Sequence, residues 1–129
     1  MTVFLHHTIV AVPDAEESAA FVADILGLAP PTRRGPFSVV HADNGVSLDF
    51  LQTEAEVASQ HYAFEVSDDA FDAIFQRILE RGLDYWADPA GSEPGRITSG
   101  AGGRGLSFEG PGGHYLEILT RPGGAAASG

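Results

Sequence analysis

Apolar and polar residues alternate along two similar stretches of the chain. The first runs from His7 to Asp14, and the second from His61 to Asp68 repeats it 54 residues further on. Histidine opens both stretches, aspartate closes both, and valine stands two residues before the aspartate in each. Both are rich in β-branched or aromatic residues, so each is predicted to form a half-buried strand. The chain is therefore expected to contain an internal repeat.

A helix is predicted after each of these strands. Residues 15–28 and 69–81 both carry apolar side chains at a spacing that gathers them on one helical face. Aspartate precedes each run and a glycine lies at its C-terminal end, as expected of helix caps. The predicted caps are Asp14 and Asp68 at the N-terminal ends and Gly27 and Gly82 at the C-terminal ends.

Short strands and turns are predicted for the rest of each half. Strands are expected at 37–41 and 46–52 in the first half, and at 84–86, 105–109 and 114–120 in the second. The closing strands also match, which aligns Asp49 with Glu117. The predicted fold class is α+β, with two tandem βαβββ modules.

The second half is longer, and the extra length lies in residues 87–105. This segment is rich in glycine and proline and is not expected to be regular for most of its length. Such a loop is either a lid over a binding site or a tolerated surface insertion. Arg96 and Arg104 lie in it, either as solvated side chains or as partners of an anionic substrate.

The chain has 129 residues, which fits one domain rather than two independent ones. We expect a single domain over residues 1–121, with modules at 3–53 and 60–121 and a flexible tail at 122–129. The N-terminus shows no signal peptide or membrane span, so a cytoplasmic protein is expected.

Composition narrows the possible partners and metal ligands. Seven Lys and Arg against eighteen Asp and Glu give a formal charge of −11, which disfavours binding to nucleic acid or a membrane surface. There is no cysteine, so any metal must be held by imidazole nitrogen and carboxylate oxygen.

Strand parity places both histidines and both carboxylates away from the bulky apolar faces. A carboxylate between apolar neighbours in a strand is costly unless it is paired or bound to a cation. Here this occurs twice, at Asp49 and Glu117, and each half also supplies a histidine, His7 or His61. A pseudo-twofold arrangement of the halves would bring the four side chains to a common centre.

These patterns resemble the vicinal oxygen chelate superfamily, which includes glyoxalase I, extradiol dioxygenases, and fosfomycin- and bleomycin-resistance proteins. The motifs are His7-x6-Asp14 with a helix ending at Leu-Gly-Leu (26–28), His61-x6-Asp68, and Gly-Pro-Gly-Gly-His-Tyr-Leu-Glu-Ile (110–118). The resemblance covers residues 3–121. It implies a curved, mixed-sheet half-barrel that cups a divalent metal, and a substrate that chelates this metal through neighbouring oxygens.

The resemblance also assigns roles to single residues. It implies that His7, His61 and Glu117 are metal ligands. Asp49 falls where some members place a fourth ligand, but it is shorter than the usual Glu or Gln. It is therefore either a ligand, a partner of one, or a polar residue at the mouth of the cavity. Tyr115 lies on the face of Glu117, either as a donor to a substrate oxyanion or as a packed aromatic. His114 is expected to be exposed in the turn before the last strand.

The implied function is a metal-dependent enzyme acting on a small molecule, with iron, manganese, nickel, cobalt or zinc as the metal. Four protein ligands favour glyoxalase-like isomerase or lyase chemistry, with Glu117 or Asp49 as the base. Three favour a dioxygenase, which needs open coordination positions. The alternative is a metal-free binding protein of the bleomycin-resistance kind. A homodimer is also expected, because family members often pair modules across chains.

Overall fold

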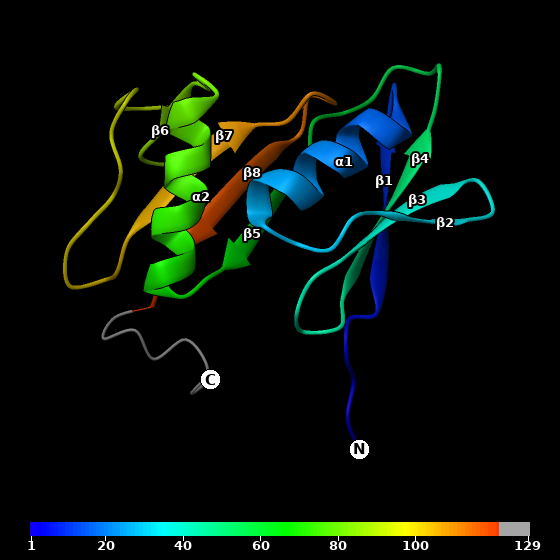
Figure 1. Cartoon of the computed structure of the whole chain (residues 1–129), viewed down its shortest axis with the longest axis horizontal. Coiled ribbons are helices and arrows are strands. Elements are labelled where there is room, and N and C mark those ends of the chain that lie inside the picture. Colours follow the sequence, from blue (N-terminus) through cyan, green and yellow to red (C-terminus); the bar gives the residue numbers. More distant parts are fainter. Residues whose placement is uncertain (122–129) are drawn as a thin grey trace. The chain divides into compact units, whose positions relative to one another are not determined.

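The computed structural model describes residues 1–121, so the predicted tail at 122–129 lies outside the described residues. The chain divides into two compact units, Met1–Ala58 and Ser59–Gly129. Each unit contains one βαβββ module with its own four-stranded mixed sheet, which confirms the predicted fold class (Figure 1). None of the helices in residues 1–121 is long and apolar enough to cross a membrane.

The first unit has one more strand than the sequence pattern predicted. Its elements are β1 (His7–Val12), α1 (Ala15–Leu26), β2 (Thr32–Arg34), β3 (Phe37–His41) and β4 (Ser47–Gln52). The strand order is β1-β4-β3-β2, with β1 parallel to β4 and the other pairs antiparallel. The additional strand is β2, whose three residues are all exposed, so no apolar alternation marked it.

The second unit repeats this topology. Its elements are β5 (His61–Glu65), α2 (Asp68–Glu80), β6 (Tyr85–Trp86), β7 (Gly105–Glu109) and β8 (Tyr115–Leu119). The order is β5-β8-β7-β6, and β5 runs parallel to β8. The first and last strands of each repeat are therefore neighbours. The strands that begin with His7 and His61 lie beside the strands that contain Asp49 and Glu117.

The helix caps are partly as predicted. The Asp14 side chain accepts a hydrogen bond from the backbone N–H of Glu17 at 3.0 Å, and Gly27 ends α1 with φ 72°. The predicted Asp68 cap is wrong: Ser67 caps α2 by accepting from the N–H of Ala70 at 3.1 Å. Asp68 is instead the first helical residue, where a negative charge favours the positive end of the helix dipole.

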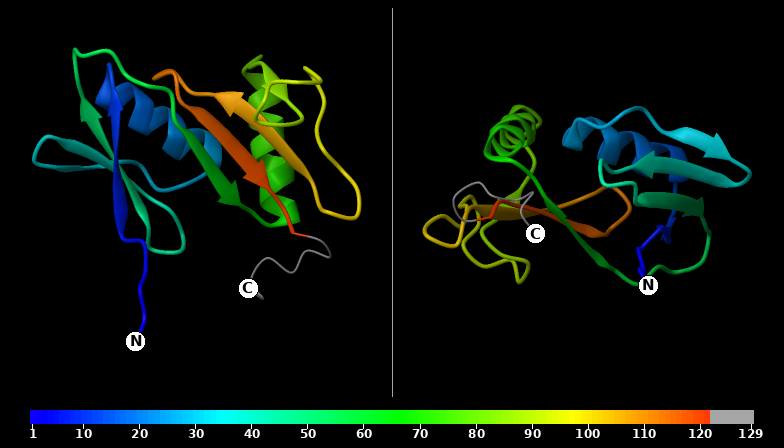
Figure 2. Two further views of the ribbon diagram at one scale, coloured as in Figure 1. Left: turned by 180° about the vertical axis from the view of Figure 1, so that it is seen from behind. Right: turned by 90° about the horizontal axis from the view of Figure 1, so that it is seen from below.

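In each unit the helix lies over one face of its sheet (Figure 2), and buried apolar side chains from both fill the core. Alternate strand residues point toward the helix, and each fully buried apolar side chain contributes about 1.5–3 kcal/mol relative to exposure. In the first unit the buried residues include Val10, Val12, Val22, Ile25 and Phe50. In the second they include Phe71, Ile74, Ile78, Leu106, Phe108 and Ile118.

The long segment between β6 and β7 folds back on its own strands. Thr98 and Gly105 exchange two backbone hydrogen bonds, at 2.8 and 2.9 Å, and the Thr98 hydroxyl donates to the carbonyl of Ala87 at 2.6 Å. Near its end, Gly103 has φ 94° and lies against Thr120 so closely that a Cβ would collide with the Thr120 carbonyl oxygen. The segment is thus tied to the sheet edge at several points.

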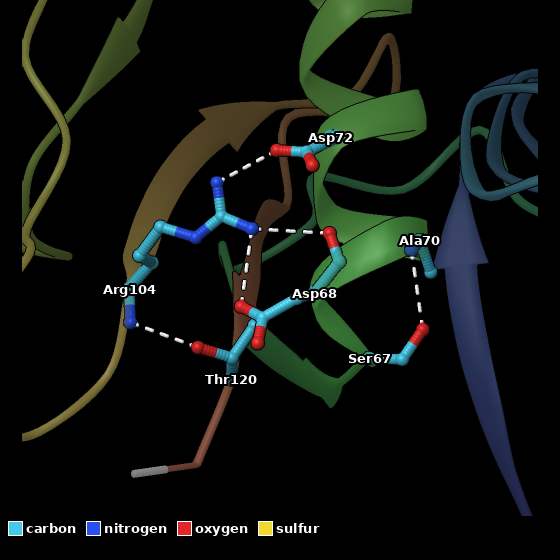
Figure 3. A network of polar contacts seen from close by, with 6 residues as sticks. All are labelled: Ser67, Asp68, Ala70, Asp72, Arg104 and Thr120. Carbon is cyan, nitrogen blue, oxygen red and sulfur yellow. Dashed lines mark hydrogen bonds and ion pairs between the residues drawn. The ribbon is translucent and has the colours of Figure 1, made fainter. Parts of the chain in front are cut away.

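Arg104 fastens the end of this segment to α2 (Figure 3). Its guanidinium donates to Asp72 at 2.7 Å and to the carboxylate of Asp68 at 3.1 Å, and it lies 4.3 Å from the centre of the Phe71 ring. The hydrogen bond to Asp72, with a smaller contribution from Asp68, raises the pKa of the Arg104 guanidinium above its ordinary value. The expectation of a solvated or substrate-binding Arg104 is therefore wrong.

Arg104→Ala is expected to lower the free energy of unfolding by about 1–2 kcal/mol. Each partly exposed ion pair contributes about 0.2–1 kcal/mol, and the contact with the Phe71 ring adds about 0.5–1 kcal/mol. Urea unfolding at constant pH measures the loss. Arg96→Ala is the matched control, because Arg96 lies exposed in the same segment with no ion pair among residues 1–121. Equal losses in both variants would contradict a fastening role for Arg104.

Candidate active site

The face of the second sheet that points away from α2 carries the candidate residues of this unit. Leu106, Phe108 and Ile118 point toward the helix, so their strand neighbours point the other way. In the ladder, Ser107 lies opposite Glu117, and Glu117 lies beside Ala63. In the next row, His61 lies beside Tyr115. We refer to this surface as the open face of the second unit.

His61 and Glu117 are in direct contact on this open face. The Nε2 atom of His61 is 2.9 Å from Oε1 of Glu117. Their side chains are 39% and 22% exposed, so both remain accessible from solvent. Ligand atoms that lie about 2.0–2.2 Å from one cation lie roughly 3 Å from each other. Two donors of the right chemistry are therefore already at the separation that one metal ion requires.

His7 holds the equivalent position in the first unit. It is exposed at the start of β1, and its Nδ1 lies 2.8 Å from Nδ1 of the neighbouring His6. Its Nε2 has no partner among residues 1–121. A histidine that ligates through one ring nitrogen usually has the other nitrogen hydrogen-bonded. The contact with His6 supplies this arrangement.

Asp49 is in a different environment from Glu117. Its carboxylate is completely buried, and it accepts hydrogen bonds from the hydroxyl of Ser47 at 2.8 Å and from the guanidinium of Arg34. Arg34 comes from β2, the strand that the pattern did not reveal, and it is 60% exposed. The cost of burying the Asp49 charge is thus compensated by a protein cation.

Tyr115 is half-buried on the open face of the second unit. Its ring packs edge-on against Trp86, with the centroids 6.4 Å apart. The contact joins β8 to β6 and so crosses β7, the strand between them that contains Ser107. The two rings give this face an aromatic rim beside Glu117.

Two other polar residues are accounted for by protein contacts. His114 was expected to be exposed, but only 6% of it is, because it packs against the Tyr62 ring and its Nδ1 accepts from the N–H of Gln60 at 2.9 Å. Burial also raises the pKa of the Tyr62 phenol. Glu65 pairs with Arg121 at 2.6 Å.

The structure brings His61 and Glu117 together and places Asp49 with Arg34. Within residues 1–121 no group of three or more histidine or acidic side chains is arranged to hold a metal ion. Of the predicted ligands, His61 and Glu117 contact each other in the second unit. In the first unit His7 contacts His6, and Asp49 pairs with Arg34. Sequence reasoning missed Arg34 and Ser107, whose significance depends on strand pairing.

The chain belongs to the Glyoxalase/Bleomycin resistance protein/Dioxygenase superfamily, whose family model matches residues 4–118. This confirms the resemblance drawn from the motifs.

Its relatives include proteins named as enzymes. The chain is 57% identical in sequence to the solved structure of Oxidase ChaP-H1. The TM-score is 0.91, and the match covers 96% of this chain and 100% of the ChaP-H1 chain. Oxidase ChaP-H2 is also 57% identical, with a TM-score of 0.90 over 98% and 99% of the two chains. The Glutathione transferase FosA of Serratia marcescens is 28% identical over 120 residues, which cover 88% of this chain and 78% of that protein.

Arg34→Ala is expected to lower the free energy of unfolding by about 1–3 kcal/mol. Among residues 1–121 it leaves the buried Asp49 carboxylate with the Ser47 hydroxyl as its one side-chain donor. Chemical denaturation measures the loss. Arg33→Ala is the matched control, since its pair with Glu16 is exposed on both sides and is expected to contribute less than about 0.5 kcal/mol. Adding Asp49→Asn to Arg34→Ala should restore part of the loss, and simple additivity of the two substitutions would refute the coupling.

Proposed function

We propose that this protein is a metal-dependent oxidising enzyme that acts with dioxygen on a small molecule carrying neighbouring oxygens. The observation that carries the proposal is the contact between His61 and Glu117 on the open face of the second unit. The identity of 57% to two proteins named as oxidases supports this direction. A metal-free binding protein would have no need for this pair of ligand types.

We propose His7, His61 and Glu117 as the metal ligands. Two imidazoles and one carboxylate form the donor set that suits non-haem iron, although manganese, cobalt, nickel and zinc also accept it. A bound redox-active metal would supply Lewis-acid binding of the substrate oxygens and one-electron chemistry with dioxygen. The proposed ligand set therefore fits the proposed reaction. The homodimer that the resemblance implies stays a prediction.

The environment of Asp49 favours an oxidase over an isomerase. A fourth protein ligand would fill a position that dioxygen chemistry needs, whereas an isomerase can use such a carboxylate as its base. Asp49 is held by Arg34 and Ser47 and is completely buried, so its recruitment as a ligand or base would break a charge-assisted hydrogen bond. We therefore propose that Asp49 stays with Arg34.

The aromatic rim favours a flat substrate such as a catechol. Trp86 and Tyr115 offer apolar surface beside Glu117. The phenol of Tyr115 can donate a hydrogen bond to a substrate oxygen as negative charge develops on it, which stabilises that charge. Trp86 holds the Tyr115 ring from the side.

His61→Ala and Glu117→Gln are each expected to weaken metal binding at least about 100-fold, because each removes a direct ligand. Anaerobic titration of the metal-free protein with Fe(II) or Co(II), followed by calorimetry and by the visible absorption of Co(II), measures the affinity. His7→Ala should have a similar effect, and Asp49→Asn should not. Glu65→Gln is the control for Glu117→Gln, because this carboxylate lies on a neighbouring strand and pairs with Arg121. Failure of the wild-type protein to bind metal would contradict the proposed function.

The iron-loaded protein is expected to consume dioxygen when it is given catechols. Tyr115→Phe should lower kcat about 100-fold while leaving Fe(II) affinity unchanged, because the phenol acts on the substrate and not on the metal. An oxygen electrode with product analysis checks this. Turnover of hemithioacetals without oxygen uptake would instead identify an isomerase, and its loss in Asp49→Asn would assign the base to Asp49.

A further inference from the structure

Ser107 carries a buried hydroxyl with no partner among residues 1–121. The residue lies in the middle of β7 and is only 1% exposed. A buried hydroxyl without a hydrogen bond costs free energy, and most buried polar atoms in proteins have a partner. This side chain therefore needs an explanation beyond the fold.

The sheet register places Ser107 beside Glu117. The two residues are directly opposite in the antiparallel pair of β7 and β8, and Trp86 is opposite Ser107 on the other side. Side chains of directly opposed residues lie on the same face, with their Cβ atoms roughly 5 Å apart. The hydroxyl thus lies on the open face, in the same row as the proposed ligand Glu117 and as Trp86.

The first unit shows that this position does not require a polar residue. There, Val39 of β3 is opposite Asp49, as Ser107 is opposite Glu117. Val39 is 3% exposed, so an apolar side chain fills the equivalent space in a sheet of the same topology. Packing alone would therefore be satisfied without the hydroxyl of Ser107.

We infer that Ser107 is a positioning residue that donates a hydrogen bond to the Glu117 carboxylate when this carboxylate binds the metal. The inference rests on the proposed function. In the structure, Oε1 of Glu117 is engaged by His61. If His61 and Glu117 both held a metal ion, they would no longer pair with each other, and the Glu117 carboxylate would need a donor to fix its orientation.

Ser107 is suited to this role by its burial as well as by its register. Its oxygen is shielded from solvent, so water does not compete for the hydrogen bond. A hydrogen bond to a charged carboxylate is also stronger than one between neutral groups. Donation by Ser107 to the Glu117 carboxylate in the metal-bound protein would thus give this hydroxyl a charged partner that water cannot replace.

Ser107→Ala tests this by two measurements, the thermal stability of the metal-free protein and its affinity for Co(II). The substitution is expected to keep or raise the stability and to lower the affinity. The metal-free variant should unfold at the same or a higher temperature than the wild type, because an unpaired buried hydroxyl has been removed. Its Kd for Co(II), measured by calorimetry and visible absorption at constant pH, should rise about 10-fold or more. Ser107→Thr, which keeps the hydroxyl, should bind Co(II) more tightly than Ser107→Ala. Ser38→Ala is the control, because it removes another buried serine hydroxyl, from the first unit.

The outcomes separate this inference from the proposed function. Tight Co(II) binding by both the wild type and Ser107→Ala would overturn the role of Ser107 and leave the metal site standing. A clear loss of stability in metal-free Ser107→Ala would also overturn it, because the hydroxyl would then serve the fold. Absence of Co(II) binding by the wild type would overturn both.

Discussion

The packing of one helix on one face of each four-stranded sheet is the constraint on which the other features depend. Successive strand residues point to opposite faces, so burying Phe50 or Ile118 against a helix turns Asp49 and Glu117 the other way. Within residues 1–121 each unit has a single helix, which packs on one face of its sheet and leaves the other face without helical cover from that unit. In the second unit this face carries the polar and aromatic side chains Ser107, Glu117, Tyr115 and Trp86.

The two repeats use the same position for different purposes. In the second unit, the longer carboxylate Glu117 contacts a histidine and remains partly exposed. In the first unit, the shorter carboxylate Asp49 is buried and held by Arg34. A charge in the interior requires a compensating charge or cation, and β2 supplies it from an exposed arginine. The internal symmetry is therefore kept in the backbone and broken in the chemistry.

The sequence predicted the parts of the structure that depend on local pattern. The strand 37–41 and the strand 105–109 were predicted at their observed bounds, since alternation and turn residues define them. The strand β2 was missed because all of its side chains are exposed, and the Asp68 cap was misplaced by one residue because Ser67 offers an equally good side chain. His114 and Arg104 were misjudged because their partners, Gln60 and Asp72, are distant in sequence.

The sequence by itself determined the repeat, the fold class and the candidate ligands, because these follow from periodicity and from matched residue types. Only the tertiary structure decided which polar groups meet. Strand pairing brought His61 to Glu117 and Asp49 to Arg34, and it left the hydroxyl of Ser107 without a partner among residues 1–121. Such pairings depend on register across strands, and no local pattern in the chain encodes that register uniquely.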